Sequence, residues 1–235
     1  MTGAKITTIG LDADDTLWHN ERFFRSTQQV FADLLRDHAE PETLDARLLA
    51  AEKRNIGRYG FGIKGFVLSM IETAIEVTDD RVPATVIRQI IEAGQEMLAH
   101  PVDLLPHARE AVEALANDFR LLLITKGDLL DQERKLAQSG LGDLFDGVEI
   151  ISAKTNAHYD DIFARHGDGA ARGLMAGNSM RSDVLPMIAA GGMGVHVPHD
   201  LVWDLEHADA PVDHPRFHQI ADLAGLEPLI RRLNR

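Results

Sequence analysis

The 235-residue chain contains no cysteine, so disulfide bonds, thiolate catalysis and cysteine-based zinc sites are excluded. It also lacks a block of lysine and arginine residues, and its formal net charge is −13. Such a chain has no basic stripe to neutralise nucleic-acid phosphates, and we expect no nucleic-acid partner. A small phosphorylated metabolite stays open as a partner, because a bound divalent cation inverts the local charge.

Long apolar runs are also missing. No stretch approaches the roughly 18 apolar residues of a membrane span, and no charged leader with an apolar segment precedes the first predicted strand. We therefore expect a cytoplasmic protein without a membrane partner. The composition, with 45% hydrophobic and 26% charged residues, is that of an ordinary globular chain.

Five short apolar runs are typical of buried parallel strands. They cover Ile6 to Leu11, Leu121 to Thr125, Val148 to Ser152, Gly173 to Ala176 and Gly194 to Val197. The last four are separated by helix-like segments, which are Leu129 to Ser139, His158 to His166 and Ser182 to Ala190. Alternating strands and helices of these lengths form right-handed βαβ units. We predict an α/β fold with a Rossmann-like parallel sheet.

Residues 20–100 differ, because they contain helical periodicity and no convincing strand. The apolar stripes are Phe23, Phe24, Val30, Phe31, Leu34 and Leu35; Phe66, Val67, Met70, Ile71, Ala74 and Ile75; and Val86, Ile87, Ile90, Ile91, Met97 and Leu98. Leu44, Leu48 and Leu49 indicate a shorter helix. A crossover needs only about a dozen residues. We therefore predict an inserted helical domain at 20–100 and a discontinuous core formed by 1–19 and 101–235.

Three carboxylates, Asp12, Asp14 and Asp15, follow the first predicted strand. Ligands of open α/β sheets bind outside the carboxyl ends of the strands. Acids crowded there repel one another, which favours a site that holds a cation, shares a proton or carries out a reaction. Asp12 could hold a metal or attack a substrate, and Asp14 could move a proton. The alternative is a solvated turn, where aspartate is common, and we expect Asp15 to be a structural hydrogen-bonding partner.

Polar residues also follow the other predicted strands. They are Thr125 and Lys126 after the second strand, Lys154 after the third, and Asn178 and Asp183 after the fourth. Each alone is compatible with a turn, a cap or a solvated side chain. A parallel sheet nevertheless brings all these loops to one edge, so we expect them to form one site with the acids of the first loop.

In these motifs and their order, the sequence resembles the haloacid dehalogenase superfamily over nearly its whole length. Asp12-x-Asp14-x-Thr16 is similar to the first motif of the family, Thr125 to the second and Lys154 to the third. The segment from Gly177-Asn178-Ser179 to Asp183 is similar to the fourth. The helical insert resembles the cap of the subclass that has an all-helical cap between the first and second motifs.

The resemblance implies a Mg²⁺-dependent phosphatase that hydrolyses a small phosphomonoester through an aspartyl-phosphate intermediate. It makes Asp12 the nucleophile and Asp14 the general acid and base. Thr125 and Lys154 are then the residues that bind the phosphoryl oxygens. Mg²⁺ is expected at the Asp12 carboxylate, the Asp14 backbone carbonyl and Asp183.

Two features depart from the family pattern. Asn178 stands where the family often has aspartate, so an amide oxygen remains for the ion but one negative charge is lost. We therefore count Asn178 among the metal-site residues and expect weaker Mg²⁺ binding. Lys154 is followed by Thr155 and Asn156 and not by the usual proline, which leaves Lys126 as the alternative phosphate-binding lysine.

The leaving group has candidate contacts in a glycine-interrupted segment, residues 54–65, of the helical insert. Arg58, Tyr59 and Lys64 could form these contacts, although the sequence slightly favours an ordinary connection between helices for this segment. The eleven histidines do not have zinc-site spacing, and we expect none of them to form a metal site.

Other functions also fit these motifs. A dehalogenase would use Asp12 to attack carbon and would need neither Asp14 nor a metal. A phosphomutase would keep all four motifs and differ by excluding water. A non-catalytic phosphate-binding protein is compatible with Asn178.

Overall fold

The structure of the protein, a computed structural model, describes residues 5–235. The chain divides into two compact units. The first, which we call the core unit, comprises Met1–Glu21, Val102–Lys126 and Gln132–Arg235. The second, the helical unit, comprises Arg22–Pro101 together with Gly127–Asp131, a short segment that follows a strand of the core unit.

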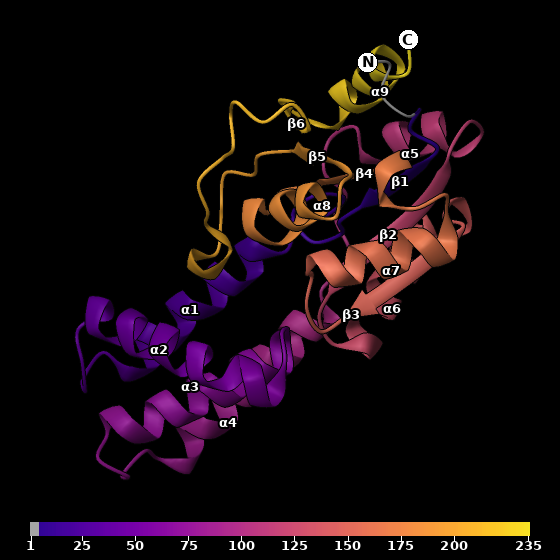
Figure 1. Cartoon of the computed structure of the whole chain (residues 1–235). Coiled ribbons are helices and arrows are strands. Elements are labelled where there is room, and N and C mark those ends of the chain that lie inside the picture. The colour runs from indigo at the N-terminus through magenta and orange to yellow at the C-terminus, as the bar shows by residue number, and fades with distance from the viewer. Residues whose placement is uncertain (1–4) are drawn as a thin grey trace. The chain divides into compact units, whose positions relative to one another are not determined.

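A parallel sheet forms the centre of the core unit (Figure 1). Its strands, in the order β3-β2-β1-β4-β5-β6, are β3 (Gly147–Ile151), β2 (Arg120–Lys126), β1 (Thr8–Leu11), β4 (Gly173–Gly177), β5 (Met193–His196) and β6 (Phe217–Gln219). The predicted α/β fold with a Rossmann-like parallel sheet is confirmed, and β1 to β5 lie within two residues of the five predicted strands. The strand β6 was not predicted, because three residues are too few to show a strand pattern.

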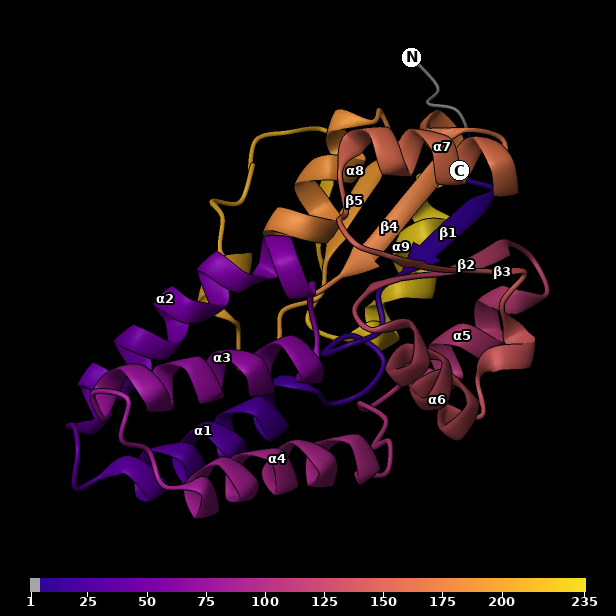
Figure 2. The same ribbon diagram turned by 90° about the horizontal axis from the view of Figure 1, so that it is seen from below.

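Helices cover both faces of the sheet (Figure 2). One face carries α7 (Asn156–His166) and α8 (Leu185–Ala189), and the other carries α5 (Ala108–Ala116) and α9 (Leu226–Leu233). Successive side chains of β2 alternate between these faces, as the strand geometry requires. Leu121 and Leu123 pack in the cluster with α5 and α9, whereas Leu122 and Ile124 pack in the cluster with α7. The sheet is therefore buried on both faces.

The helical unit is built around four helices. They are α1 (Glu21–Leu35), α2 (Pro41–Tyr59), α3 (Ile63–Val77) and α4 (Ala84–Ala99). Their buried apolar side chains come largely from the predicted stripes and include Phe31, Leu48, Phe66, Met70 and Ile90. The helix around Leu48 is longer than predicted, since α2 continues to Tyr59. The helical conformation is interrupted at residues 60–62, between α2 and α3. Gly60 and Gly62 have φ angles of 75° and 110° there, in the region that favours glycine.

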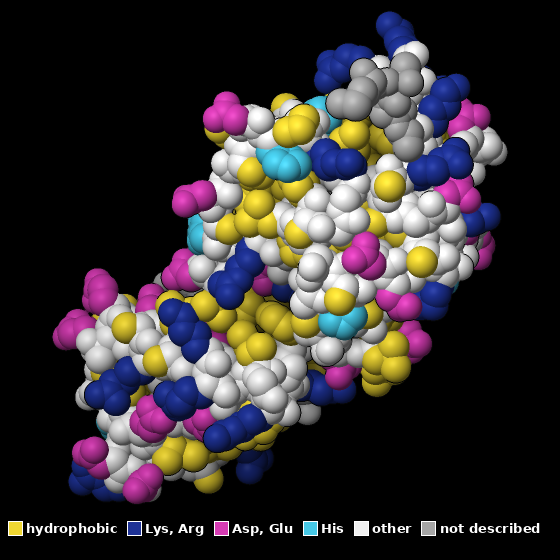
Figure 3. All heavy atoms as spheres, in the orientation of Figure 1, with side chains coloured by type: hydrophobic (Ala, Val, Ile, Leu, Met, Phe, Trp, Pro, Cys, Tyr) yellow, Lys and Arg dark blue, Asp and Glu magenta, His cyan; other side chains and the backbone are white. Residues whose placement is uncertain are grey.

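No helix within residues 5–235 is long and apolar enough to cross a membrane. On the face seen in Figure 3, lysine and arginine side chains are interspersed with aspartate and glutamate side chains over both units. The surface of this face therefore carries charges of both signs.

Candidate active site

The four motifs meet at the carboxyl edge of the sheet. Leu11, the last residue of β1, pairs with Leu123 of β2 on one side and with Ala176 of β4 on the other. Asp12 continues this register, because its backbone N–H donates to the Ala176 carbonyl at 3.0 Å. The carboxylate of Asp12 thus stands between the loops that follow β2 and β4.

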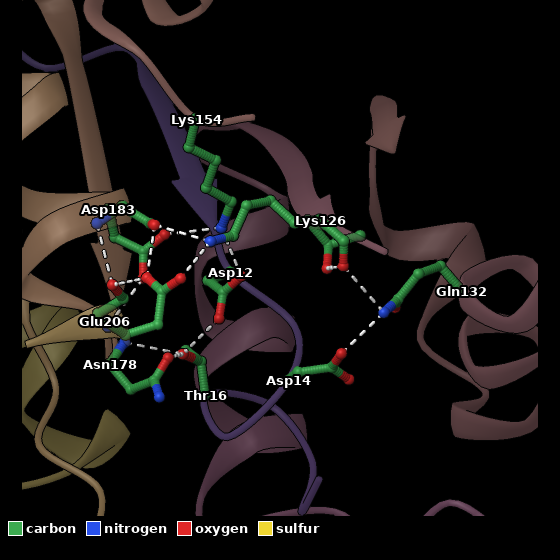
Figure 4. Close-up of polar contacts among 12 residues, drawn as sticks. Asp12, Asp14, Thr16, Lys126, Gln132, Lys154, Asn178, Asp183 and Glu206 are labelled. Atoms are coloured by element: carbon green, nitrogen blue, oxygen red, sulfur yellow. Dashed lines mark hydrogen bonds and ion pairs between the residues drawn. The ribbon is translucent and has the colours of Figure 1, made fainter. Parts of the chain in front are cut away.

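Lys154 bridges two carboxylates in this edge (Figure 4). Its Nζ donates to Asp12 Oδ1 at 2.5 Å and to Asp183 Oδ1 at 2.6 Å. The Lys154 side chain is 1% exposed, and so is that of Asp183. Lys154 was expected to bind phosphoryl oxygens. In the structure its ammonium group is hydrogen-bonded to Asp12, the expected nucleophile.

Burial has opposite effects on the two partners of this ion pair. It raises the pKa of Asp12, which Lys154 lowers and Asp183 raises again, and the result is a value of about 7. Burial lowers the pKa of Lys154, but the charges and hydrogen bonds of Asp12 and Asp183 outweigh it and leave the pKa above its usual range. Lys154 is therefore a permanent cation, and a further cation beside Asp12 would favour the ionised carboxylate.

Asn178 and Asp12 present oxygen atoms to the same hydroxyl group. Thr16 Oγ1 donates to Asp12 Oδ2 at 3.0 Å and lies 3.3 Å from Asn178 Oδ1, while the Asn178 backbone N–H donates to Thr16 Oγ1 at 3.0 Å. The sequence places Thr16 only within the first motif. In the structure it fixes the loop after β4 against the loop after β1.

Asp183 lies differently from the sequence expectation. Its Oδ1 accepts from Lys154, and its Oδ2 accepts from the Ser179 backbone N–H at 2.9 Å. Both oxygens of this fully buried carboxylate are thus hydrogen-bonded within the protein. Asp183 is the ion-pair partner of Lys154 in this arrangement, and its role at Mg²⁺ stays a prediction.

Gly177 makes the close approach of these carboxylates possible. A Cβ atom at this position would lie 2.2 Å from Asp183 Oδ2 and 2.9 Å from the Cβ of Asp12. No side chain fits there without moving one of the two acids.

Replacing Gly177 by alanine should therefore destabilise the protein and displace Asp183. Overpacking of a rigid interior costs about 1–3 kcal/mol, and urea unfolding measures this loss of unfolding free energy. Gly57→Ala is the matched control, because a Cβ at this exposed helical position meets nothing within 4 Å. There we expect a gain of about 0.5–1 kcal/mol. Equal stabilities of the two variants would contradict the close approach at Gly177.

Three donors hold Asp14 in the core unit. Asp14 Oδ1 accepts from Trp18 Nε1 at 2.8 Å and from Lys135 Nζ at 2.9 Å, and its Oδ2 accepts from Gln132 Nε2 at 2.7 Å. In Figure 4 the Asp14 side chain points toward Gln132. Gln132 and Lys135 come from α6 (Leu129–Ser139), and neither was predicted as a site residue. No sequence signal marked them, because polar residues of a helix are usually solvated.

Lys126 pairs with Glu206. Its Nζ donates to Glu206 Oε1 at 2.5 Å and to Ser182 Oγ at 2.8 Å. Glu206 was not predicted either, since it lies in an irregular connection after β5 that carries no motif. Thr125, the other predicted phosphate-binding residue of this loop, is buried, and its Oγ1 donates to the Lys126 carbonyl at 3.3 Å.

The candidate substrate residues of the insert belong to the helical unit. Tyr59 donates to Glu72 at 3.2 Å, and Lys64 pairs with Asp128 at 2.9 Å within that unit. Arg58 is exposed in the last turn of α2. Their role at the leaving group stays a prediction.

The remaining acid, Asp15, and the histidine nearest the loop after β4, His196, have structural partners. Asp15, at a φ of 60°, accepts from the backbone N–H groups of Asn20 and Glu21 at the start of α1. His196 Nε2 lies 3.1 Å from the Asn178 carbonyl oxygen. Within the described part of the chain, no three or more His, Asp or Glu side chains are grouped so that they could hold a metal ion.

Comparisons with known proteins agree with the resemblance that the sequence motifs showed. The sequence profile of the haloacid dehalogenase-like hydrolases matches residues 6–191. A haloacid dehalogenase-like hydrolase from Xanthomonas campestris has a similar structure, with 40% identity and a TM-score of 0.88 over 100% of this chain and 97% of the other. The comparison with curated proteins gave no match.

Two more distant structures share the fold. One is the putative hydrolase YfnB from Bacillus subtilis bound to magnesium, with 18% identity and a TM-score of 0.64 over 97% of this chain and 99% of the other. The second is the L-2-haloacid dehalogenase from Xanthobacter autotrophicus, with 17% identity and a TM-score of 0.67 over 96% and 98%. The fold therefore occurs in a magnesium-bound protein and in a dehalogenase.

Proposed function

The chain belongs to the haloacid dehalogenase-like hydrolases, and within this family we propose that it is a Mg²⁺-dependent phosphatase of a small phosphomonoester. The observation that carries the proposal is the second carboxylate, Asp14, which Trp18, Gln132 and Lys135 hold in the same core unit as Asp12. Transfer from an ester requires a group that protonates the leaving oxygen, and Asp14 can supply it.

The proposed reaction has two steps at phosphorus. Asp12 attacks the phosphoryl group and forms an aspartyl-phosphate, while the ester bond breaks and the leaving oxygen takes a proton from Asp14. Asp14 then accepts a proton from water, whose oxygen attacks phosphorus and releases phosphate and free Asp12. The hydrolysis of a phosphate monoester requires its activation barrier to be lowered by roughly 20 kcal/mol or more. A covalent intermediate replaces that single high barrier by two lower ones.

Charge around Asp12 supports a requirement for a further cation. Each of the three site lysines already pairs with a carboxylate of the protein: Lys154 with Asp12 and Asp183, Lys126 with Glu206, and Lys135 with Asp14. Four carboxylates thus face three ammonium groups before a doubly charged phosphoryl group arrives. The repulsion between that group and Asp12 needs an additional positive charge.

The oxygen atoms near Thr16 fit Mg²⁺, which prefers one or two carboxylates with other oxygen ligands and water. Asp12 Oδ2 and Asn178 Oδ1 are both within hydrogen-bonding distance of the Thr16 hydroxyl group, so these two oxygens are close to each other. The Asp14 backbone carbonyl is the third proposed ligand. When bound, the ion would offset charge on the phosphoryl oxygens. Lys154 keeps Asp12 in place from the other oxygen of the carboxylate.

One observation favours the dehalogenase alternative. Lys154 already supplies a cation to Asp12 Oδ1, so the carboxylate is oriented without a metal ion and could attack carbon. The fold of the Xanthobacter autotrophicus dehalogenase is compatible with this alternative. Asp14 would then have no proton to transfer, since a halide leaves without one.

Turnover of two substrate types should separate the two activities. We expect phosphate release from an aryl phosphate in the presence of Mg²⁺, and a loss of about 100-fold or more when a chelator removes the ion. Chloride release from chloropropionate is the parallel assay. Chloride release that is unaffected by the chelator, without phosphate release, would contradict the phosphatase proposal.

A further inference from the structure

Glu206 brings a buried carboxylate to the loops that follow β2 and β4. It ends a short helical turn, Asp204–Glu206, in the connection between β5 and β6. Oε1 accepts from Lys126 Nζ at 2.5 Å, and Oε2 accepts from the hydroxyl groups of Ser182, at 2.5 Å, and Ser179. Figure 4 shows the Glu206 carboxylate directed at this group of donors. Three separate segments of the core unit therefore meet at one carboxylate.

The pair formed by Lys126 and Glu206 is shielded from water. The two side chains are 14% and 15% exposed. Burial raises the pKa of Glu206, but the charge of Lys126 and the hydrogen bonds from Lys126, Ser179 and Ser182 outweigh it, so the pKa is lower than usual. Glu206 is thus ionised, and solvent screens its attraction for the ammonium group only weakly.

The same pair adjoins the Asp12 site. Lys126 donates to Ser182, the residue before Asp183, and Asp183 is paired with Lys154. The buried Tyr159 hydroxyl donates to the Ser182 carbonyl at 3.0 Å. Burial and the charges of Asp183, Asp12 and Glu206 together raise the pKa of this tyrosine.

We propose that Glu206 limits the affinity of the site for phosphate by serving as the internal counter-ion of Lys126. The inference rests on the proposed phosphatase function. Lys126 directly follows Thr125 at the end of β2, where phosphoryl oxygens are expected. While its ammonium group is neutralised by Glu206, an incoming or departing phosphate gains less from it. Product phosphate is then held less tightly and leaves sooner.

Calorimetric titration with inorganic phosphate in the presence of Mg²⁺ tests this role on the full chain. Glu206→Gln retains an acceptor for the two serine hydroxyls but removes the negative charge, and we expect phosphate to bind at least about 10-fold more tightly. The double variant Lys126→Met with Glu206→Gln removes both charges. Its phosphate affinity should return to within about threefold of the wild type.

Glu149→Gln is the matched control. Glu149 also accepts from basic side chains, Arg165 and His166, and its side chain is 17% exposed, but it lies on the edge strand β3. The substitution changes the net charge of the protein equally, and we expect a change in phosphate affinity below about twofold.

A purely structural Glu206 would give the opposite result. Its removal would loosen the turn that carries Asp183, and phosphate would bind equally or more weakly in Glu206→Gln, which would overturn the proposal. Should that variant not fold, the double variant decides. Phosphate affinity within about threefold of the wild type would support the proposal, whereas a loss of about 10-fold or more would show that Lys126 binds phosphate despite Glu206 and would overturn it. Phosphate affinity is measured without turnover, so this inference can fail while the phosphatase proposal stands. Asp12→Asn tests the latter separately.

Discussion

Asp12→Asn is expected to reduce phosphate release to below about 1% of the wild-type rate, since an amide cannot attack phosphorus. The fold should persist. Asp12 is a buried acid whose ionisation is opposed by burial, with a pKa of about 7, and asparagine removes that cost. The amide oxygen can still accept from Lys154, which keeps its ion pair with Asp183. Phosphate assays and thermal melting measure the two effects on the same preparation.

Asp168→Asn provides the control for this substitution. Asp168 is an exposed acid of the core unit that pairs with Arg172 and accepts from Thr7, the residue before β1, whereas Asp12 follows the other end of that strand. The same change from carboxylate to amide there should leave the rate within about twofold of the wild type. Turnover by Asp12→Asn above a few per cent, with deamidation excluded by mass spectrometry, would contradict the assignment of Asp12 as nucleophile.

Much of the sheet edge is predictable from the sequence, because it follows from local patterns and one topological rule. Apolar runs such as Leu121 to Thr125 show where strands end, and parallel strands end at one edge. That rule predicts that Asp12, Lys154 and Asp183 lie together, and the three side chains do form one ion-paired cluster. The pattern could not show that Lys154 donates a hydrogen bond to Asp183. The resemblance had implied that Asp183 is a metal ligand.

The site residues that the sequence did not reveal depend on contacts between distant parts of the chain. Gln132 lies 118 positions from Asp14, and Glu206 lies 80 positions from Lys126. Nothing next to Gln132 or Glu206 in the sequence marks it, since glutamine in a helix and glutamate in a loop are usually solvated. Only the packing of α6 and of the connection after β5 gives them a role. Secondary structure and topology fix the site's backbone positions, whereas the surrounding layer of side chains depends on tertiary packing.

Asp14→Asn should distinguish substrates by their leaving groups. The substitution retains the shape and an acceptor oxygen for Trp18 or Gln132, but it removes the proton donor and the charge that pairs with Lys135. General acid catalysis contributes roughly 10²- to 10⁴-fold. We expect a loss of that size for an alkyl phosphate, whose leaving oxygen needs a proton. An aryl phosphate, with a leaving group that is stable as an anion, should lose much less in the first step.

Burst kinetics separate this first step from the second. With an aryl phosphate, Asp14→Asn should release aryl alcohol in a burst and then stall, because the aspartyl-phosphate on Asp12 waits for a water that no base activates. Lys135→Met is the companion variant, since it removes a donor that holds Asp14 but keeps the carboxylate itself. It should slow the alkyl phosphate more than the aryl phosphate, by smaller factors than Asp14→Asn, because the proton donor is misplaced but still present. If Asp14→Asn slowed the first step equally for the aryl and the alkyl phosphate, Asp14 would not be the proton donor.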